Sequence, residues 1–171
     1  MRVKILETER LILRQMRAED AEFIFELVNE AAFIRNIGDK GVRTLDDARN
    51  YILNGPVASY AKFGFGLYMV ALRETGEAIG ICGLLKRDSL GDVDIGFAFL
   101  ERFRKKGFAY EAAAAVMGYG RNALGLKRIV AITSADNDGS MRVLEKIGLR
   151  FEKTIRMPGS DEDIRLFVPR S

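Results

Sequence analysis

The spacing of apolar residues divides the first third of the chain into one strand and two helices. Apolar and polar residues alternate through Glu9–Arg14, which predicts a strand. From Ala18 to Glu30, apolar residues recur every three or four positions, as on one face of a helix. Thr44 and Asp47 resemble a capping box, with Asp in place of the usual Glu, and predict the start of a second helix. Gly55-Pro56 is expected to interrupt this helix.

The rest of the chain shows strand and helix patterns in a regular order, with turn residues between them. The predicted strands are Gly66–Leu72, Ala78–Leu85, Asp92–Leu100, Arg128–Thr133, Leu149–Ile155 and Ile164–Val168. The predicted helices are Phe108–Ala123 and Asp138–Ile147. This order predicts an α/β (α+β) fold, with a mixed, mostly antiparallel twisted sheet and helices on both faces. We expect one domain over residues 1–171.

Composition indicates a water-soluble globular protein. The chain is 48% hydrophobic and 30% charged, and no apolar run is long enough to span a bilayer. The N-terminus leads directly into strand-like sequence, without the apolar core of a secretory signal. Cys82 is the single cysteine, lies within a predicted strand and has no expected role. These features together predict a cytoplasmic protein.

The sequence contains no histidine, which excludes several classes of active site. Nucleophilic sites of the Ser-His-Asp and Cys-His types cannot form, nor can zinc sites that use histidine. Proton transfer therefore has to use a carboxylate, a tyrosine, a lysine, the cysteine, a serine, a chain terminus or water.

A basic segment with one glycine, Arg104–Ala109, joins a predicted strand to a predicted helix. The first N–H groups of a helix lack intrahelical partners, and the helix dipole adds a partial positive charge there. A glycine lets an anion approach those groups, so the segment predicts a phosphate or pyrophosphate site. A basic cluster alone is more often a solvated turn, but its place before a helix favours a ligand. Nucleic acid is less favoured, because no aromatic platform beyond Phe103 is interleaved with the basic residues and no second basic stripe lies nearby.

Two further segments offer candidate chemistry. Val93–Phe99 alternates as a core strand, and Asp94 on its other face is a candidate general base, with Glu101 a weaker one. Asn137 and Ser140 stand at the next strand-to-helix junction, where both residue types commonly cap helices.

The same junction has the spacing of a calcium-binding EF-hand loop, which we judge to be coincidental. Position 1 lacks a carboxylate, and the preceding element is a predicted strand rather than a helix. No metal site is therefore expected. The residues at positions 1, 3, 5, 6 and 12 of that loop are Ser134, Asp136, Asp138, Gly139 and Glu145.

Three blocks, in the expected order, carry a resemblance to a known family. Arg104–Ala109 fits R-x-x-G-x-A, and Asn137–Arg150 is similar to N-x-x-S-x-x-v-l-E-K-x-G-F. Both are patterns of the GNAT acetyltransferase superfamily. The opening Leu6–Arg14 looks like the first strand of its RimJ/RimL branch, the ribosomal-protein-alanine acetyltransferases. The resemblance spans nearly the whole chain and implies the same fold as the pattern of elements.

The resemblance implies acetyl-CoA as co-substrate, bound along one strand and two helix starts. The strand backbone of Phe97–Phe99, with Gly96 as a bulge or splay point, would hold the pantetheine arm, and Asn137 would contact it. Many members have a tyrosine acid where this chain has Leu144, so Ser140 is a substitute donor, and its roles as cap and acid both stay open. The residues assigned to acetyl-CoA are Phe97, Ala98, Phe99, Arg104, Lys105, Lys106, Gly107, Phe108, Ala109, Asn137 and Ser140.

The predicted activity is acetyl transfer to a primary amine by direct attack, with Asp94 and Ser140 as catalytic candidates. The acceptor is a protein N-terminus or a small molecule, and residues 36–43 and 156–163 are expected to frame it. The alternative is a non-catalytic CoA-binding or RNA/ribosome-associated module on the same fold. Neither hypothesis requires a membrane, and both are compatible with a homodimer.

Overall fold

The fold is built on one eight-stranded sheet, with strand order β1-β2-β3-β4-β5-β6-β8-β7. The computed structural model describes residues 2–170. The strands are β1 (Lys4–Glu7), β2 (Leu11–Arg14), β3 (Leu67–Leu72), β4 (Ala78–Leu85), β5 (Val93–Phe99), β6 (Ile129–Ser134), β7 (Leu149–Ile155) and β8 (Ile164–Pro169). Neighbouring strands are antiparallel except for β5 and β6, which run parallel.

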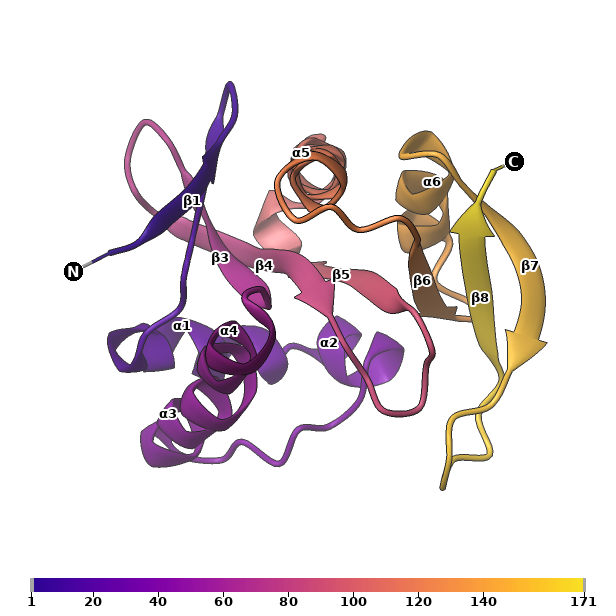
Figure 1. Cartoon of the computed structure of the whole chain (residues 1–171). Coiled ribbons are helices and arrows are strands. Elements are labelled where there is room, and N and C mark those ends of the chain that lie inside the picture. Colours follow the sequence, from indigo (N-terminus) through magenta and orange to yellow (C-terminus); the bar gives the residue numbers. More distant parts are fainter. Residues whose placement is uncertain (1, 171) are drawn as a thin grey trace.

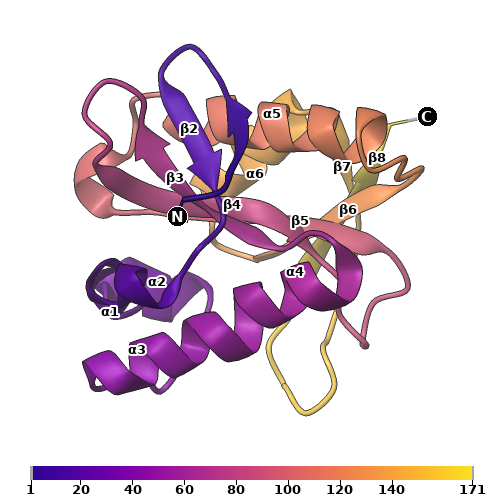
Figure 2. The ribbon, with the colours of Figure 1, turned by 60° about the vertical axis from the view of Figure 1, so that its left-hand side comes forward.

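Helices cover both faces of the sheet, as the sequence predicted (Figures 1 and 2). The helices are α1 (Ala21–Val28), α2 (Ala31–Asn36), α3 (Leu45–Ile52), α4 (Ala58–Phe63), α5 (Phe108–Asn122) and α6 (Asp138–Lys146). Short turns of helix lie at Ala18–Asp20, Leu53–Val57 and Glu101–Phe103. α5 and α6 pack on one face, and α1 to α4 pack on the other (Figure 2).

The alternation along β5 divides its side chains between two cores. Val93, Ile95 and Phe99 are buried in the cluster under α5, while Ala98 packs against the cluster under α1 to α4. On α5 the small residues Ala112 and Ala113 are fully buried, which lets the helix lie close to the sheet.

The sheet opens into a wedge where β5 and β6 diverge. Their parallel pairing consists of Val93 with Ile129 and Asp94 with Val130. Beyond Asp94, β5 continues to Phe99 with β4 as its one strand partner within residues 2–170. The pairing of β4 and β5 has no register shift, so Gly96 is not a bulge, and the divergence already begins after Asp94.

The first half of the chain differs from the predicted elements in three places. The opening strand is a hairpin, because residues 9 and 10 lie in the turn between β1 and β2. The 18–30 helix ends at Val28, and α2 follows separately. Pro56 does not break the 44–61 helix, because a wider π-type turn at Leu53–Val57 accommodates its missing N–H.

Two smaller predictions are confirmed. The capping box forms, with the Asp47 N–H donating to Thr44 Oγ1 at 3.0 Å and the Thr44 N–H donating to Asp47 Oδ2 at 3.2 Å. Cys82 is fully buried in β4, and burial raises the pKa of its thiol.

Of the helices within residues 2–170, none has the length and apolar character needed to cross a membrane.

Candidate functional site

Two adjoining cavities occupy the wedge and the sheet face beside it. The larger, of about 880 Å³, lies between the start of α5 and the start of α6. The smaller, of about 340 Å³, extends over β4 and β5 on the side of α1 to α4. The residues that line both cavities are Phe33, Asn36, Ile37, Phe97, Ala98, Asn137 and Ser140. A ligand in one cavity therefore meets a ligand in the other at the open part of β5.

The larger cavity contains the start of α5, where the sequence predicted a phosphate or pyrophosphate site. Gly107 is the N-cap of α5 and has a left-handed backbone, with φ of +84°. Because glycine has no side chain, it leaves the N–H groups of Phe108 and Ala109 uncapped and facing an open approach. Phe97, Ala98 and Phe99 reach the same cavity from the unpaired edge of β5. The structure thus brings together the two predicted contact regions for a long anionic ligand.

The turn between β1 and β2 braces this helix start from outside. The Glu111 carboxylate on the first turn of α5 accepts hydrogen bonds from Thr8 Oγ1 at 2.5 Å, the Arg10 N–H at 2.9 Å and Arg10 Nε at 2.7 Å. Arg10 also donates to the Lys106 carbonyl at 3.0 Å, and its guanidinium lies 4.3 Å from the centre of the Phe108 ring. These contacts fix the position of the basic loop relative to the first turn of α5.

We expect Glu111→Ala to lower the free energy of unfolding by roughly 1–3 kcal/mol, since hydrogen bonds to a charged, partly buried group are lost. Burial raises the pKa of Glu111, but the bonds from Thr8 and Arg10 outweigh it and lower that pKa overall. The bonds should therefore stabilise the fold above pH 4.5 and weaken as the pH falls through the lowered pKa.

Urea unfolding at pH 7 and at pH 3 checks this, with Glu7→Ala as the control. Glu7 makes two exposed ion pairs, with Lys4 and Arg73, which should contribute little. Equal effects of the two substitutions would show that the brace is unimportant.

The basic residues before α5 make separate contacts, and only some of them line the larger cavity. Arg102 is an ion-pair partner of Glu26 on α1, with Nη1 and Oε2 2.7 Å apart. Arg104 donates from Nε to the Phe99 carbonyl at 3.1 Å. Arg104 and Lys105 line the larger cavity, whereas Lys106 lines neither cavity of the described chain and contributes its carbonyl to Arg10.

Three cations that the sequence analysis missed also line the larger cavity. They are Arg35 on α2 and Arg142 and Lys146 on α6. With Arg104 and Lys105 they make five cationic side chains, against the two carboxylates of Asp136 and Asp138. The four-residue spacing of Arg142 and Lys146 placed both on one helix face and was the one signal available in the sequence. The excess of positive charge favours an anionic ligand.

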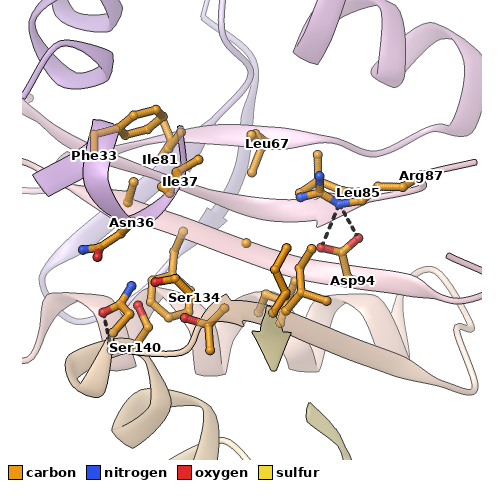
Figure 3. A pocket seen from close by; sticks show the side chains of 18 of the residues that line it. Phe33, Asn36, Ile37, Leu67, Ile81, Leu85, Arg87, Asp94, Ser134 and Ser140 are labelled. Atoms are coloured by element: carbon orange, nitrogen blue, oxygen red, sulfur yellow. Dashed lines mark hydrogen bonds and ion pairs between the residues drawn. The ribbon is translucent and has the colours of Figure 1, made fainter. Parts of the chain in front are cut away.

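At the start of α6, the structure separates the two candidate caps. Asn137 is the N-cap, and its Oδ1 accepts the Ser140 N–H at 3.2 Å. The Ser140 side chain is therefore not the cap, and it lines both cavities at their junction (Figure 3). Leu144 is buried one turn later, in the position where a tyrosine acid is common in the resembled family.

The smaller cavity contains a buried carboxylate. Asp94 is 1% exposed and accepts from Arg87 Nε at 3.0 and 3.3 Å (Figure 3). Burial raises the pKa of Asp94 to about 6, and the charge and hydrogen bond of Arg87 oppose the rise. Asp94 is the last β5 residue that pairs with β6, so it stands at the apex of the wedge. Glu101, the weaker candidate, is exposed and lines neither cavity among the described residues.

The two loops expected to frame an acceptor both reach this cavity. Ile37 and Lys40 come from the first loop, and Met157 and Glu162 from the second. Ser134 at the end of β6 was considered only as an EF-hand position, but it also lines the cavity, and its buried hydroxyl has no hydrogen-bond partner in the described structure.

The EF-hand spacing around this serine does not form a cluster of ligands. The element before it is strand β6, as predicted. Within residues 2–170, no group of three or more carboxylate or cysteine side chains is arranged to hold a metal ion.

A family model, a related protein sequence and a solved structure all identify acetyltransferases as similar to this chain. Residues 10–150 match the family model described as an acetyltransferase (GNAT) domain. The chain is 34% identical over 153 residues to the uncharacterized N-acetyltransferase YoaA of Bacillus subtilis, covering 89% of this chain and 86% of that protein. An acetyltransferase of Agrobacterium tumefaciens superposes with a TM-score of 0.82 at 26% identity, over 97% of this chain and 94% of its own.

RimL, a ribosomal alpha-N-protein acetyltransferase solved in complex with coenzyme A, has the same fold. It superposes with a TM-score of 0.82 over 96% of each chain, at 17% identity. Residues 10–150, which match the GNAT family model, include the basic loop, the open strand and the start of α6. The chain described here therefore belongs to the GNAT acetyltransferase family.

Proposed function

We propose that this protein transfers an acetyl group from acetyl-CoA to a primary amine, using the larger cavity for the co-substrate and the smaller one for the acceptor. The observation that carries the proposal is the wedge itself. Its wider side has uncapped helix N–H groups and excess positive charge, and its apex holds a buried carboxylate with a raised pKa.

The residues present fit acetyl-CoA, which supplies the acetyl group as a thioester. Phe108 and Ala109 offer uncapped N–H groups to the pyrophosphate beside Gly107. Arg104 and Lys105 add charge there. The edge of β5 at Phe97–Phe99 that no strand of the described chain pairs with faces the pantetheine arm, although the Phe99 carbonyl is already bonded to Arg104, and Asn137 lies across the wedge from it. Lys106 acts indirectly in this proposal, through its carbonyl bond to Arg10.

Asp94 and Ser140 are the proposed proton-transfer residues. A base works best when its pKa is close to the working pH, and a pKa of about 6 leaves Asp94 ionised at pH 7 yet able to accept a proton. Asp94 takes the proton that the acceptor amine loses. Ser140, whose hydroxyl is not used as the helix cap, passes a proton to the departing thiolate and regains one from water, and Asp94 releases the amine proton to water before the next turnover.

The RimJ/RimL branch is the finer assignment that we propose. The opening segment that resembled this branch forms the β1–β2 hairpin which braces α5. A protein N-terminus fits that branch, but small amines and amino acids fit the fold equally well, so the branch by itself does not decide the acceptor.

The test measures binding and turnover separately. Calorimetry with acetyl-CoA should give saturable binding, and CoA release should rise on addition of a suitable amine from a panel of peptides, amino acids and small amines. Tight binding without CoA release across the whole panel would instead support the non-catalytic module.

Replacing Ser140 with alanine should lower kcat by roughly 10²–10⁴-fold if its hydroxyl is the proton donor. Because Asn137 caps the helix, Ser140→Ala should leave the melting temperature unchanged. Asn137→Ala is the matched control, since loss of this cap should cost ~1 kcal/mol of stability in the free protein. A kcat within about twofold of wild type, well below the general-acid range, would assign the proton to solvent.

A further inference from the structure

The smaller cavity contains a second charged feature that proton transfer does not use. Asp94 contacts Arg87 through Nε, and the two terminal nitrogens of the guanidinium have no hydrogen-bond partner within residues 2–170. The Arg87 side chain is 39% exposed and lines the cavity. The terminal N–H groups of Arg87, whose geometry suits a carboxylate, are therefore available to a ligand beside the proposed base.

Lys40 is a second cation in the lining of the same cavity. It comes from the loop between α2 and α3, and it has no ion-pair or hydrogen-bond partner in the described part of the chain. Although its side chain reaches solvent, burial and the neighbouring charge of Arg87 lower the pKa of its ammonium. Two cations from different loops therefore line one cavity and repel each other, and an anionic group of a ligand would relieve their repulsion.

The remainder of the cavity is mainly apolar and small. Its walls include Leu67, Leu85, Ile95, Met157 and Ile164. A volume of about 340 Å³ is near the lower end of the range for small-molecule sites, which is ~300–1,000 Å³. Glu162 is the one further charged group in the lining, and it comes from the loop between β7 and β8.

We infer that the acceptor is a small amino acid-like molecule, with an apolar side chain and a carboxylate next to the amine that is acetylated. Its amine would lie at Asp94, its carboxylate at the free side of Arg87 and at Lys40, and its side chain on the apolar walls. A polyamine would bring further positive charge toward two cations, and a peptide N-terminus lacks the carboxylate. The inference rests on the proposed function, because it assigns the acceptor of the same reaction.

Leucine, leucinamide and a tripeptide with N-terminal leucine test the inference directly. The wild type should have a kcat/KM for leucine about 10- to 100-fold above that for leucinamide, the value of one or two charge-assisted hydrogen bonds. Lys40→Gln should reduce this preference about tenfold, mainly through the KM of leucine. Lys127→Gln, on an exposed residue outside both cavities, is the control and should keep the preference.

Calorimetric titration of leucine into the CoA-saturated protein separates the two proposals. Binding of leucine that weakens in Lys40→Gln, without any CoA release, would support an amino acid-binding site at Arg87 and Lys40 and overturn both the acceptor role and the acetyltransferase proposal. Efficient acetylation of leucinamide or the tripeptide, with little of leucine, would overturn the assignment and keep the acetyltransferase. Neither binding nor turnover of any of the three compounds would overturn the acceptor assignment, while CoA release with another amine of the panel would keep the acetyltransferase proposal.

Discussion

Gly107→Val should weaken the binding of acetyl-CoA by roughly 10²–10⁴-fold, because a side chain at the N-cap would displace the loop and obstruct the approach of the pyrophosphate to the helix N–H groups. Hydrogen bonds from such groups to a charged ligand contribute roughly 1.5–3 kcal/mol each, and two of them would be blocked. A Cβ at this position would also stand 3.2 Å from Arg10 Nη2, so it would press on the brace of the loop.

The control has to separate lost binding from backbone strain. Gly107 has φ of +84°, where a residue with a side chain costs ~1–2 kcal/mol. Gly76, in the turn between β3 and β4, has nearly the same φ of +79°, but a Cβ there would meet nothing within 4 Å. Gly76→Val should therefore lose similar stability and keep its affinity for acetyl-CoA. Calorimetry on both folded variants is the measurement, and wild-type affinity in Gly107→Val would refute the loop assignment.

The parts of this site that follow from local sequence were predictable. A strand, a basic loop with one glycine and a helix are all encoded within residues 93–122, and the structure has them there. The same is true of the alternation along β5. These features depend on neighbours in the chain, so periodicity and turn residues carry them.

Features that join distant segments were not predictable in this way. The brace of the loop joins Arg10 to Glu111 across 101 positions, and no local pattern of either segment indicates it. The wedge depends on where β6 leaves β5, which is set by the pairing of β6 with β8 much later in the chain. The cap at Asn137 rather than Ser140 depends on the residue at which α6 starts, and boundaries are the least certain part of any prediction from sequence.

Asp94→Asn should lower kcat by roughly 10²–10⁴-fold, as expected for loss of a positioned general base. The substitution keeps the shape of the side chain and removes a buried charge. It also leaves Arg87 without its partner, but that side chain is 39% exposed and water can solvate it. The fold should therefore survive, and the loss should appear in kcat rather than in the affinity for acetyl-CoA.

Asp92→Asn is the matched control, because Asp92 makes the same type of pair with Arg128, at 3.0 Å, on the surface two positions earlier. It should change kcat by less than about twofold, since exposed ion pairs contribute little.

The pH dependence of the wild type gives an independent test of Asp94. A base has to be ionised to accept a proton, so kcat/KM, which reports ionisations of the free enzyme, should rise as the pH increases through about 6 and level off above it. Because the pKa in the folded protein lies above the ordinary value of 3.8, ionisation of Asp94 also costs folding stability over the same interval. Between pH 4 and pH 6 the wild type should therefore lose stability relative to Asp94→Asn, while its kcat/KM increases. A residual activity of Asp94→Asn that still rises through pH 6 would assign this ionisation to another group and remove Asp94 from the role of base.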